Sequence, residues 1–279
     1  MHTRAYIMGG SSGIGLAIAK ELRRRNVDVL VAARNPARLA TAVRAIQDEP
    51  GTGLVESREL DVTDAGAAER ILREAVDTFG APDLLVNSAG FARPGVFDDL
   101  TAENLVTSFQ VNLLGPWNAT HALLDPLRRS GGTILNVSSV AGLIGIYGLT
   151  DYCATKFGVV GFSEALRQEL APFNVRVKVL CPPDTDTPGL EQENATKPVE
   201  TKAVSGSARL FTAEEVAAAA VRGLTRPRFL IIPERMSRFA LTVRTVAPRF
   251  FFRAMDTIVR RAQLSETAEH SKTSTRKGQ

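Results

Sequence analysis

The chain has 279 residues, of which 44% are hydrophobic and 23% charged, and its formal net charge is +4. This length fits one α/β domain with an appendage and is too short for two full domains. Two cysteines exclude a disulfide framework and favour a reducing compartment, and no apolar run reaches the length that spans a bilayer. Because the N-terminus begins with a strand-like pattern and not with a secretory signal, we expect a cytoplasmic protein.

The charge is unevenly distributed along the chain. Residues 226–279 contain 12 Arg or Lys against 4 Asp or Glu, whereas the other 225 residues contain 22 against 26. This asymmetry indicates a slightly acidic body with a basic C-terminal end.

The N-terminal pattern predicts a strand, a glycine-rich turn and a helix. Residues 5–8 form an apolar strand, glycines follow at Gly9, Gly13 and Gly15, and a helical pattern continues from Leu16. A turn of this kind lets the backbone approach a pyrophosphate, and the helix N-terminus favours its negative charge. A glycine cluster alone is often only a tight turn, but this position between strand and helix points to dinucleotide binding.

The second strand, residues 27–33, ends at Arg34, and Arg38 lies one turn into the next helix. Folds that prefer NAD place a carboxylate at this point to hold the ribose 2′-hydroxyl. Two guanidinium groups instead suit a 2′-phosphate, so the sequence favours NADP. The alternative is a pair of solvent-facing arginines.

Two further strands, residues 54–60 and 84–86, precede a long helix predicted over residues 101–128. Asp61 follows the first of these strands, and either Asp61 or Thr63 is in a position to cap the helix that begins near Asp64. Asn112 lies in the middle of the long helix, where an asparagine is most often a surface residue.

A strand at residues 133–137 leads to Ser139, and Tyr152 and Lys156 lie four residues apart in the following helix. The Tyr and Lys side chains share one helix face, where the cation is expected to lower the phenol pKa. Such a phenol passes a proton to a carbonyl oxygen that the Ser139 hydroxyl holds, which indicates carbonyl reduction or its reverse. The alternative is an i,i+4 pair on a solvated face.

Taken together, these motifs resemble the short-chain dehydrogenase/reductase family over about residues 3–232. The resemblance implies an α/β fold with a doubly wound, Rossmann-type parallel sheet in a single domain, extended by a C-terminal amphipathic helical segment. It also implies that Tyr152 gives the proton, Lys156 lowers its pKa and binds the nicotinamide ribose, Ser139 orients the carbonyl, and Asn112 supports Lys156 through a water. The implied NADPH/NADP site consists of Gly9, Ser11, Ser12, Gly13, Ile14, Gly15, Arg34, Arg38, Asp61, Val62, Asn87, Ala89, Gly90, Tyr152, Lys156, Pro182, Thr185 and Thr187. No metal is expected.

The chain departs from the family pattern at two positions. Met8 stands where the family usually has Thr before the first glycine, and Pro183 replaces the usual glycine of the Pro-Gly turn, which stiffens that turn. The run from Cys181 to Thr201 resembles the substrate loop of one branch, the 3-ketodihydrosphingosine reductases. This resemblance implies NADPH-dependent reduction of the C3 ketone of a lipophilic long-chain substrate. The alternative is a polar, proline-rich lid without substrate information.

A helix with a capping box at residues 212–224 and a strand at 228–232 complete the predicted domain. Residues 235–262 then have a basic amphipathic pattern that is broken at Pro248. A segment of this kind suits a membrane interface. The alternative is a helical segment that packs on the domain or on a dimer partner. The predicted division is a catalytic domain, 1–232, with a lid, 183–211; a helical extension, 233–264; and a disordered tail, 265–279.

Two other functions remain open. One is the same chemistry on another lipophilic carbonyl compound, such as a steroid, a retinoid or a 3-oxoacyl compound. The other is a non-catalytic protein that senses NADP. We expect a homo-oligomer that is cytoplasmic or peripheral on the cytoplasmic face of a membrane, and we expect no nucleic-acid partner.

Overall fold

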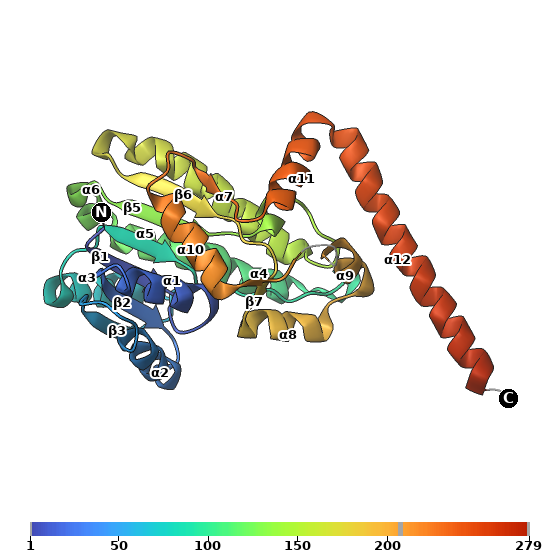
Figure 1. The fold of residues 1–279 in the computed structure, drawn as a ribbon, viewed down its shortest axis with the longest axis horizontal. Coiled ribbons are helices and arrows are strands. Elements are labelled where there is room, and N and C mark those ends of the chain that lie inside the picture. The colour runs from blue at the N-terminus through green and yellow to red at the C-terminus, as the bar shows by residue number, and fades with distance from the viewer. Residues whose placement is uncertain (1, 206–208, 278–279) are drawn as a thin grey trace.

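The structure is a computed structural model that describes residues 2–205 and 209–277, with side chains described up to residue 265. Seven strands form one parallel sheet in the order β3-β2-β1-β4-β5-β6-β9 (Figure 1). Their bounds are β1 (Arg4–Met8), β2 (Asp28–Ala33), β3 (Val55–Glu59), β4 (Leu84–Asn87), β5 (Thr133–Val137), β6 (Arg176–Leu180) and β9 (Leu230–Ile231). The strand order reverses between β1 and β4, so the predicted doubly wound sheet is confirmed.

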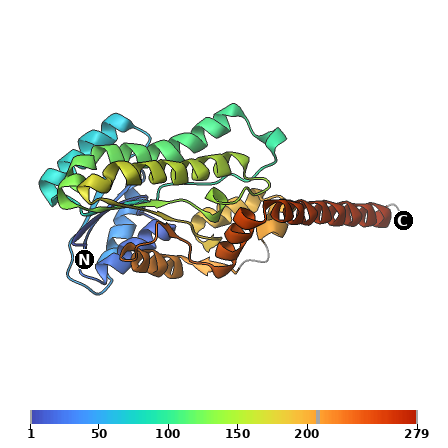
Figure 2. The same ribbon diagram turned by 90° about the horizontal axis from the view of Figure 1, so that it is seen from above.

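Helices cover both faces of this sheet (Figure 2). One face packs against α1 (Gly13–Arg23), α2 (Pro36–Gln47) and α10 (Ala213–Leu224). The other packs against α3 (Ala65–Phe79), α5 (Gly115–Ala122), α6 (Leu124–Ser130) and α7 (Thr150–Leu170). Because successive side chains of a strand point to opposite faces, Ala5 and Ile7 of β1 enter the first core while Tyr6 and Met8 enter the second.

Two asparagines join the central strands below the site. Asn87 at the end of β4 donates hydrogen bonds to Asn136 Oδ1 of β5 at 2.8 Å and to Thr120 Oγ1 of α5 at 3.1 Å. Asn136 in turn donates to Ser163 Oγ of α7 at 2.8 Å. All four side chains are buried, so this polar chain fixes the sheet relative to the two helices that carry the site.

The predicted helix over 101–128 is interrupted. The structure has α4 (Ala102–Phe109), a π-helical turn (Gln110–Leu114), α5, and α6 after a break at Leu123. Pro116 lacks the N–H that an uninterrupted α-helix would use, which explains why the helix widens just before it. The final strand is also shorter than the predicted 228–232.

The predicted lid contains four short elements: β7 (Thr185–Asp186), α8 (Pro188–Thr196), α9 (Val199–Ser205) and β8 (Phe211–Thr212). β7 and β8 pair in parallel, while residues 206–208 of the lid lie outside the described residues. The capping box of α10 is confirmed: Thr212 Oγ1 accepts from Glu215 N, and the Glu215 carboxylate accepts from Thr212 N.

The C-terminal segment forms α11 (Arg235–Val246) and α12 (Pro248–Lys277), broken at Pro248 as predicted. α12 leaves the body of the protein as a long projection (Figures 1 and 2). Its backbone is helical as far as Lys277, and the disordered tail that the sequence predicts from residue 265 remains a prediction. Residues 278–279 lie outside the described residues. In the part of the chain that the structure describes, none of the helices has the length and hydropathy needed to cross a bilayer.

Candidate active site

A cavity of about 1050 Å³ opens at the carboxyl ends of the parallel strands. This is the edge at which doubly wound folds bind their ligands. Of the predicted site residues, those that line it are Gly9, Ser11, Ser12, Gly13, Ile14, Arg34, Arg38, Asp61, Val62, Ala89, Gly90, Ser139, Tyr152, Lys156, Pro182, Thr185 and Thr187. Gly15, Asn87 and Asn112 are instead buried behind its wall.

The glycine-rich turn between β1 and α1 has the shape of a phosphate cradle. Gly9 has a φ of +79°, and a Cβ on Gly15 would lie 2.3 Å from Gly9 O, so the turn packs too tightly for side chains at these positions. Ser12 is the N-cap of α1 but makes no capping hydrogen bond with its side chain, and the first turn of α1 contains no acidic residue. The positive end of the helix therefore has no side-chain counter-charge, which fits the pyrophosphate of a dinucleotide.

Two arginines follow the end of β2. Arg34 and Arg38 are exposed and line the cavity, and Arg34 Nη1 lies 3.9 Å from Asp61 Oδ2. Asp61 Oδ1 accepts hydrogen bonds from Thr63 N at 2.9 Å and Thr63 Oγ1 at 2.8 Å. Burial acts to raise the Asp61 pKa, but the Thr63 hydrogen bonds and the Arg34 charge hold it below its usual value. The N-cap of the next helix is Asp64, so capping does not occupy Asp61.

Ser139, Tyr152 and Lys156 meet on one wall of the cavity. Ser139 follows β5 and starts a single 3₁₀ turn, while Tyr152 and Lys156 lie in the first two turns of α7. Ser138 Oγ donates to Lys156 O at 2.9 Å, which ties α7 to the end of β5. Lys156 Nζ donates to Val137 O at 3.0 Å and lies 5.5 Å from the centroid of the Tyr152 ring. The predicted grouping of these three side chains is thus present, and the surface-pair alternative is excluded because Lys156 is buried.

The predicted lowering of the Tyr152 pKa is wrong. Burial raises the pKa of Tyr152 above its ordinary value and the charge of Glu193 raises it further, whereas a hydrogen bond with Ser139 lowers it. Burial also lowers the pKa of Lys156 to about 8, although electrostatic interactions with Cys181 and Glu193 act to raise it. Desolvation is thus the largest influence on both pKa values, and the phenol is protonated at neutral pH.

Asn112 is buried in the π-helical turn, so the sequence-based alternative of a surface residue is excluded. Its Oδ1 accepts from Phe91 N at 2.9 Å, and its Nδ2 donates to Phe91 O at 3.0 Å and to Thr155 Oγ1 at 3.2 Å. Thr155 Oγ1 donates to Tyr152 O at 2.8 Å. Asn112 thus connects the loop after β4 to the turn of α7 that carries Tyr152, and π-helical turns are frequent at functional sites.

Sequence reasoning missed the polar residues that the lid contributes. Asp184, Glu193 and Lys197 line the cavity, and Lys197 Nζ pairs with Asp184 Oδ2 at 3.1 Å. Leu190 and Glu193 lie three residues apart in α8, and Lys197 follows four residues later as its C-cap. This spacing is the signal that would have identified the two charged residues.

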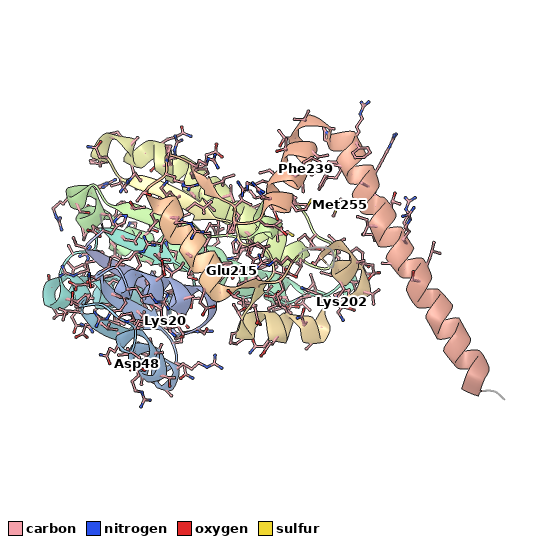
Figure 3. The ribbon with its side chains drawn as sticks, viewed as in Figure 1. Lys20, Asp48, Lys202, Glu215, Phe239 and Met255 are labelled. Carbon is pink, nitrogen blue, oxygen red and sulfur yellow. The ribbon has the colours of Figure 1, made fainter. Side chains whose placement is uncertain are left out.

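Sequence reasoning also missed apolar lining from the C-terminal helices. Met236 and Ala240 of α11 and Phe251, Met255 and Ile258 of α12 line the same cavity. Figure 3 labels Met255 on the side of α12 that faces the body of the protein. Some of the apolar side chains of this segment thus pack toward the catalytic domain, in place of forming one continuous outer surface.

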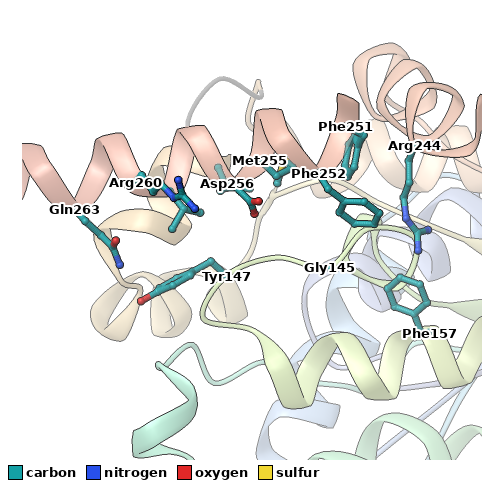
Figure 4. Close-up of a pocket in the computed structure, with 12 residues that line it drawn as sticks. Gly145, Tyr147, Phe157, Arg244, Phe251, Phe252, Met255, Asp256, Arg260 and Gln263 are labelled. Atoms are coloured by element: carbon teal, nitrogen blue, oxygen red, sulfur yellow. The ribbon is translucent and has the colours of Figure 1, made fainter. Parts of the chain in front are cut away.

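A second cavity of about 680 Å³ lies between α12, α9 and the loop after β5 (Figure 4). Val204, Phe251 and Met255 line both cavities. Arg244 connects α11 to the catalytic domain beside this cavity. Its guanidinium donates to Leu143 O and lies 5.3 Å from the centroid of the Phe157 ring.

Known proteins resemble this chain in sequence and in fold. The sequence profile of the short chain dehydrogenase family matches residues 3–198. The 3-ketodihydrosphingosine reductase of Mus musculus is 36% identical over 80% of this chain and 68% of its own length. That of Dictyostelium discoideum is 32% identical over 91% of this chain and 81% of its own length. An alcohol dehydrogenase of the archaeon Thermococcus sibiricus, solved with 5-hydroxy-NADP, superposes with a TM-score of 0.72 at 27% identity, over 82% of this chain and 95% of that one.

Proposed function

This chain belongs to the short-chain dehydrogenase/reductase family, and from that premise we propose that it reduces the C3 ketone of 3-ketodihydrosphingosine with NADPH. The observation that carries the proposal is the meeting of Ser139, Tyr152 and Lys156 in a cavity that also contains a phosphate cradle and an apolar extension. The similarity to two 3-ketodihydrosphingosine reductases over most of the chain supports the substrate.

The residues of the cavity fit NADPH. The glycine-rich turn and the N-terminus of α1 suit the pyrophosphate, and Arg34 and Arg38 suit the 2′-phosphate. Asp61 and Val62 would hold the adenine, and Ala89, Gly90, Pro182, Thr185 and Thr187 line the part of the cavity that is left for the rest of the cofactor. When bound, NADPH supplies the hydride that reduces the ketone carbon.

The protein's own side chains bind the ketone oxygen and donate the proton. The Ser139 hydroxyl donates a hydrogen bond to that oxygen, and Tyr152 transfers its phenolic proton to it as negative charge develops. The raised pKa of Tyr152 keeps this proton in place until the substrate is reduced. Lys156 stabilises the phenolate that results, and Asn112 positions the turn that carries Tyr152. With these roles, the site holds a protonated Tyr152 that is ready to donate its proton when the ketone is reduced.

The alkyl chain of the substrate extends toward the C-terminal helices in this proposal. The catalytic domain is residues 1–232, and the extension, residues 233–264, adds apolar side chains to the far end of the cavity. Because Val204, Phe251 and Met255 line both cavities, the two cavities adjoin and together offer a path for a long hydrocarbon chain.

We also propose that the outer side of this extension contacts a membrane. Large apolar side chains are exposed there, including Phe239 at 64%, Val246 at 79% and Phe250 at 69%. Exposed arginines accompany them at Arg235, Arg238, Arg249, Arg253 and Arg261. An apolar surface with arginines around it suits an interface with anionic lipid, where the lipophilic substrate resides. Sedimentation with anionic vesicles tests this contact.

Homo-oligomerisation remains a proposal as well. The outer surface of α4, the π-helical turn and α5 exposes Leu105, Val106, Leu114 and Trp117. Such a contiguous set of apolar side chains is more typical of a subunit contact than of a free surface. Light scattering of the purified protein measures the subunit number.

A substrate panel tests the proposed function. Purified protein is given NADPH with detergent-dispersed 3-ketodihydrosphingosine, a 3-oxoacyl thioester, a steroid ketone and a retinal, and NADPH oxidation is followed. The proposal requires the highest kcat/KM on the sphingoid ketone. A higher value on another carbonyl compound would keep the fold and the chemistry but replace the substrate, and no turnover of any of the four compounds would favour a non-catalytic role.

A further inference from the structure

The lid helix α8 directs one carboxylate into the catalytic cavity. Leu190 is buried, and Glu193, three residues later, lies on the same face of the helix; both line the cavity that contains Ser139, Tyr152 and Lys156. Thr187, the N-cap of α8, fixes the start of this helix through the hydrogen bond that its Oγ1 accepts from Leu190 N at 3.2 Å. Glu193 is half-buried in this position.

The nearest cation of the lid already has a partner. Lys197 Nζ pairs with Asp184 Oδ2 at 3.1 Å, and the Lys197 side chain is only 4% exposed. Within the described part of the chain, no hydrogen bond or ion pair within 4 Å holds the Glu193 carboxylate. Glu193 is therefore a half-buried acid without a direct counter-ion, an arrangement that a bound cation would complete.

The charge of Glu193 acts on the residues that carry the reaction. It raises the pKa of Tyr152 and acts to raise the pKa of Lys156 against the effect of burial. Burial raises the pKa of Glu193 itself to about 6, partly offset by the charges of Lys197 and Lys156, so the carboxylate is ionised at neutral pH. A negative charge is thus present in the cavity in which a ketone would react, where it acts on both Tyr152 and Lys156.

We propose that Glu193 binds an ammonium group carried by the carbon next to the reacting ketone. This inference rests on the proposed function, because 3-ketodihydrosphingosine bears an amino group on C2 and its ketone on C3. With the ketone oxygen held by Ser139 and Tyr152, the neighbouring amino group lies in the same cavity as the carboxylate. A charge-assisted hydrogen bond between ammonium and carboxylate then sets the orientation of the substrate.

The same contact selects among ketones. A 3-oxoacyl compound, a steroid or a retinoid has no amino group beside its carbonyl, so it would leave the Glu193 carboxylate half-buried without a partner. Sites that are built to bind a polar group discriminate strongly against an analogue that lacks it. Glu193 is therefore a residue that determines specificity, separate from the residues that transfer the proton.

Two ketones that differ only in the amino group test the inference. The wild type, Glu193→Gln and Glu191→Gln are compared on 3-ketodihydrosphingosine and on 1-hydroxyoctadecan-3-one, with NADPH in each case. Glu191 lies on the same helix, is exposed and does not line the cavity, which makes it a matched control. The readout is the ratio of the two kcat/KM values, which a general loss of structure would not change. Thermal unfolding and NADPH binding show whether the Glu193→Gln variant is folded. If it is not, Glu193→Ala takes its place.

We expect the wild type to prefer the amino ketone and Glu193→Gln to reduce that preference by about 10-fold to 100-fold, while Glu191→Gln keeps it. An unchanged ratio in the Glu193 variants, or equal efficiency of the wild type on both ketones, would overturn the inference and leave the proposed function in place. A wild type that turns over neither ketone would contradict the proposed function and this inference with it.

Discussion

Lys156 Nζ and Asn112 Oδ1 both lie against the bare α-carbon of Gly90: an added Cβ there would lie 3.2 Å from the first atom and 3.0 Å from the second. Gly90 thus lets the loop after β4 come close to both the residue that stabilises the phenolate and the residue that positions the helix turn of Tyr152. The close approach depends on the absence of a side chain at this one position.

Gly90→Ala should therefore displace the Lys156 ammonium. We expect kcat/KM to fall by about 10-fold to 100-fold, because small misplacements of reacting groups have effects of that size. Gly95→Ala is the control, since an added Cβ there meets only Leu100 Cδ2 at 3.7 Å. Equal activity of the two variants would show that the spacing across Gly90 is not critical.

Tyr152→Phe should remove the proton donor and keep the cavity. We expect turnover to fall by about 100-fold to 10,000-fold, the usual contribution of a general acid. NADPH binding, followed by fluorescence, should persist because the glycine-rich turn and the two arginines remain. Turnover close to that of the wild type would remove Tyr152 from the mechanism.

The lowered pKa of Lys156 predicts a pH dependence of stability. Folding lowers this pKa from 10.5 to about 8, so between these values the unfolded chain binds a proton that the folded chain does not. The free energy of unfolding of the wild type, relative to Lys156→Met, should therefore rise with pH across this window, by at most about 1.4 kcal/mol per pH unit. Urea unfolding at several pH values measures the difference, and a flat or falling difference would contradict the assignment.

Arg34→Ala should weaken the preference for NADPH over NADH. A guanidinium that binds the 2′-phosphate contributes only with NADPH, so we expect a fall of about 10-fold to 100-fold in kcat/KM for NADPH and little change for NADH. Arg44→Ala, an exposed arginine on α2 outside the cavity, should leave the preference intact. If both variants keep the wild-type preference, Arg34 is one of the solvent-facing arginines of the alternative interpretation.

Met255→Trp should shorten the alkyl chain that the enzyme accepts. Met255 lines both cavities, and a larger side chain there would obstruct the path between them. We expect kcat/KM to fall for an 18-carbon ketone and to change little for an 8-carbon analogue. Leu264→Trp, an exposed position on the same helix, is the control. A similar loss on both chain lengths would place the alkyl chain elsewhere.

The sequence was sufficient for those parts of the site that depend on local motifs. The turn from Gly9 to Gly15 and the pair Tyr152 and Lys156 are set by spacing within one strand–turn–helix unit or one helix, and the structure places them as expected. The Arg34 position follows directly from the end of β2.

Features that depend on tertiary packing were not predictable in the same way. The π-helical turn around Asn112 arises from a proline four residues later, and a helical pattern does not reveal it. The direction of the Tyr152 pKa shift depends on burial, which spacing alone does not give. The division of the C-terminal face between Phe251, which is buried, and Phe250, which is exposed, depends on how α12 docks on the body.

The central claim, reduction of a sphingoid C3 ketone with NADPH, is tested most directly by the product. Purified protein is incubated with 3-ketodihydrosphingosine and either NADPH or NADH, and sphinganine is measured by mass spectrometry. The account predicts sphinganine in stoichiometric amounts with the NADPH consumed, at a rate well above that with NADH. Absence of sphinganine, with NADPH bound to the protein, would contradict it.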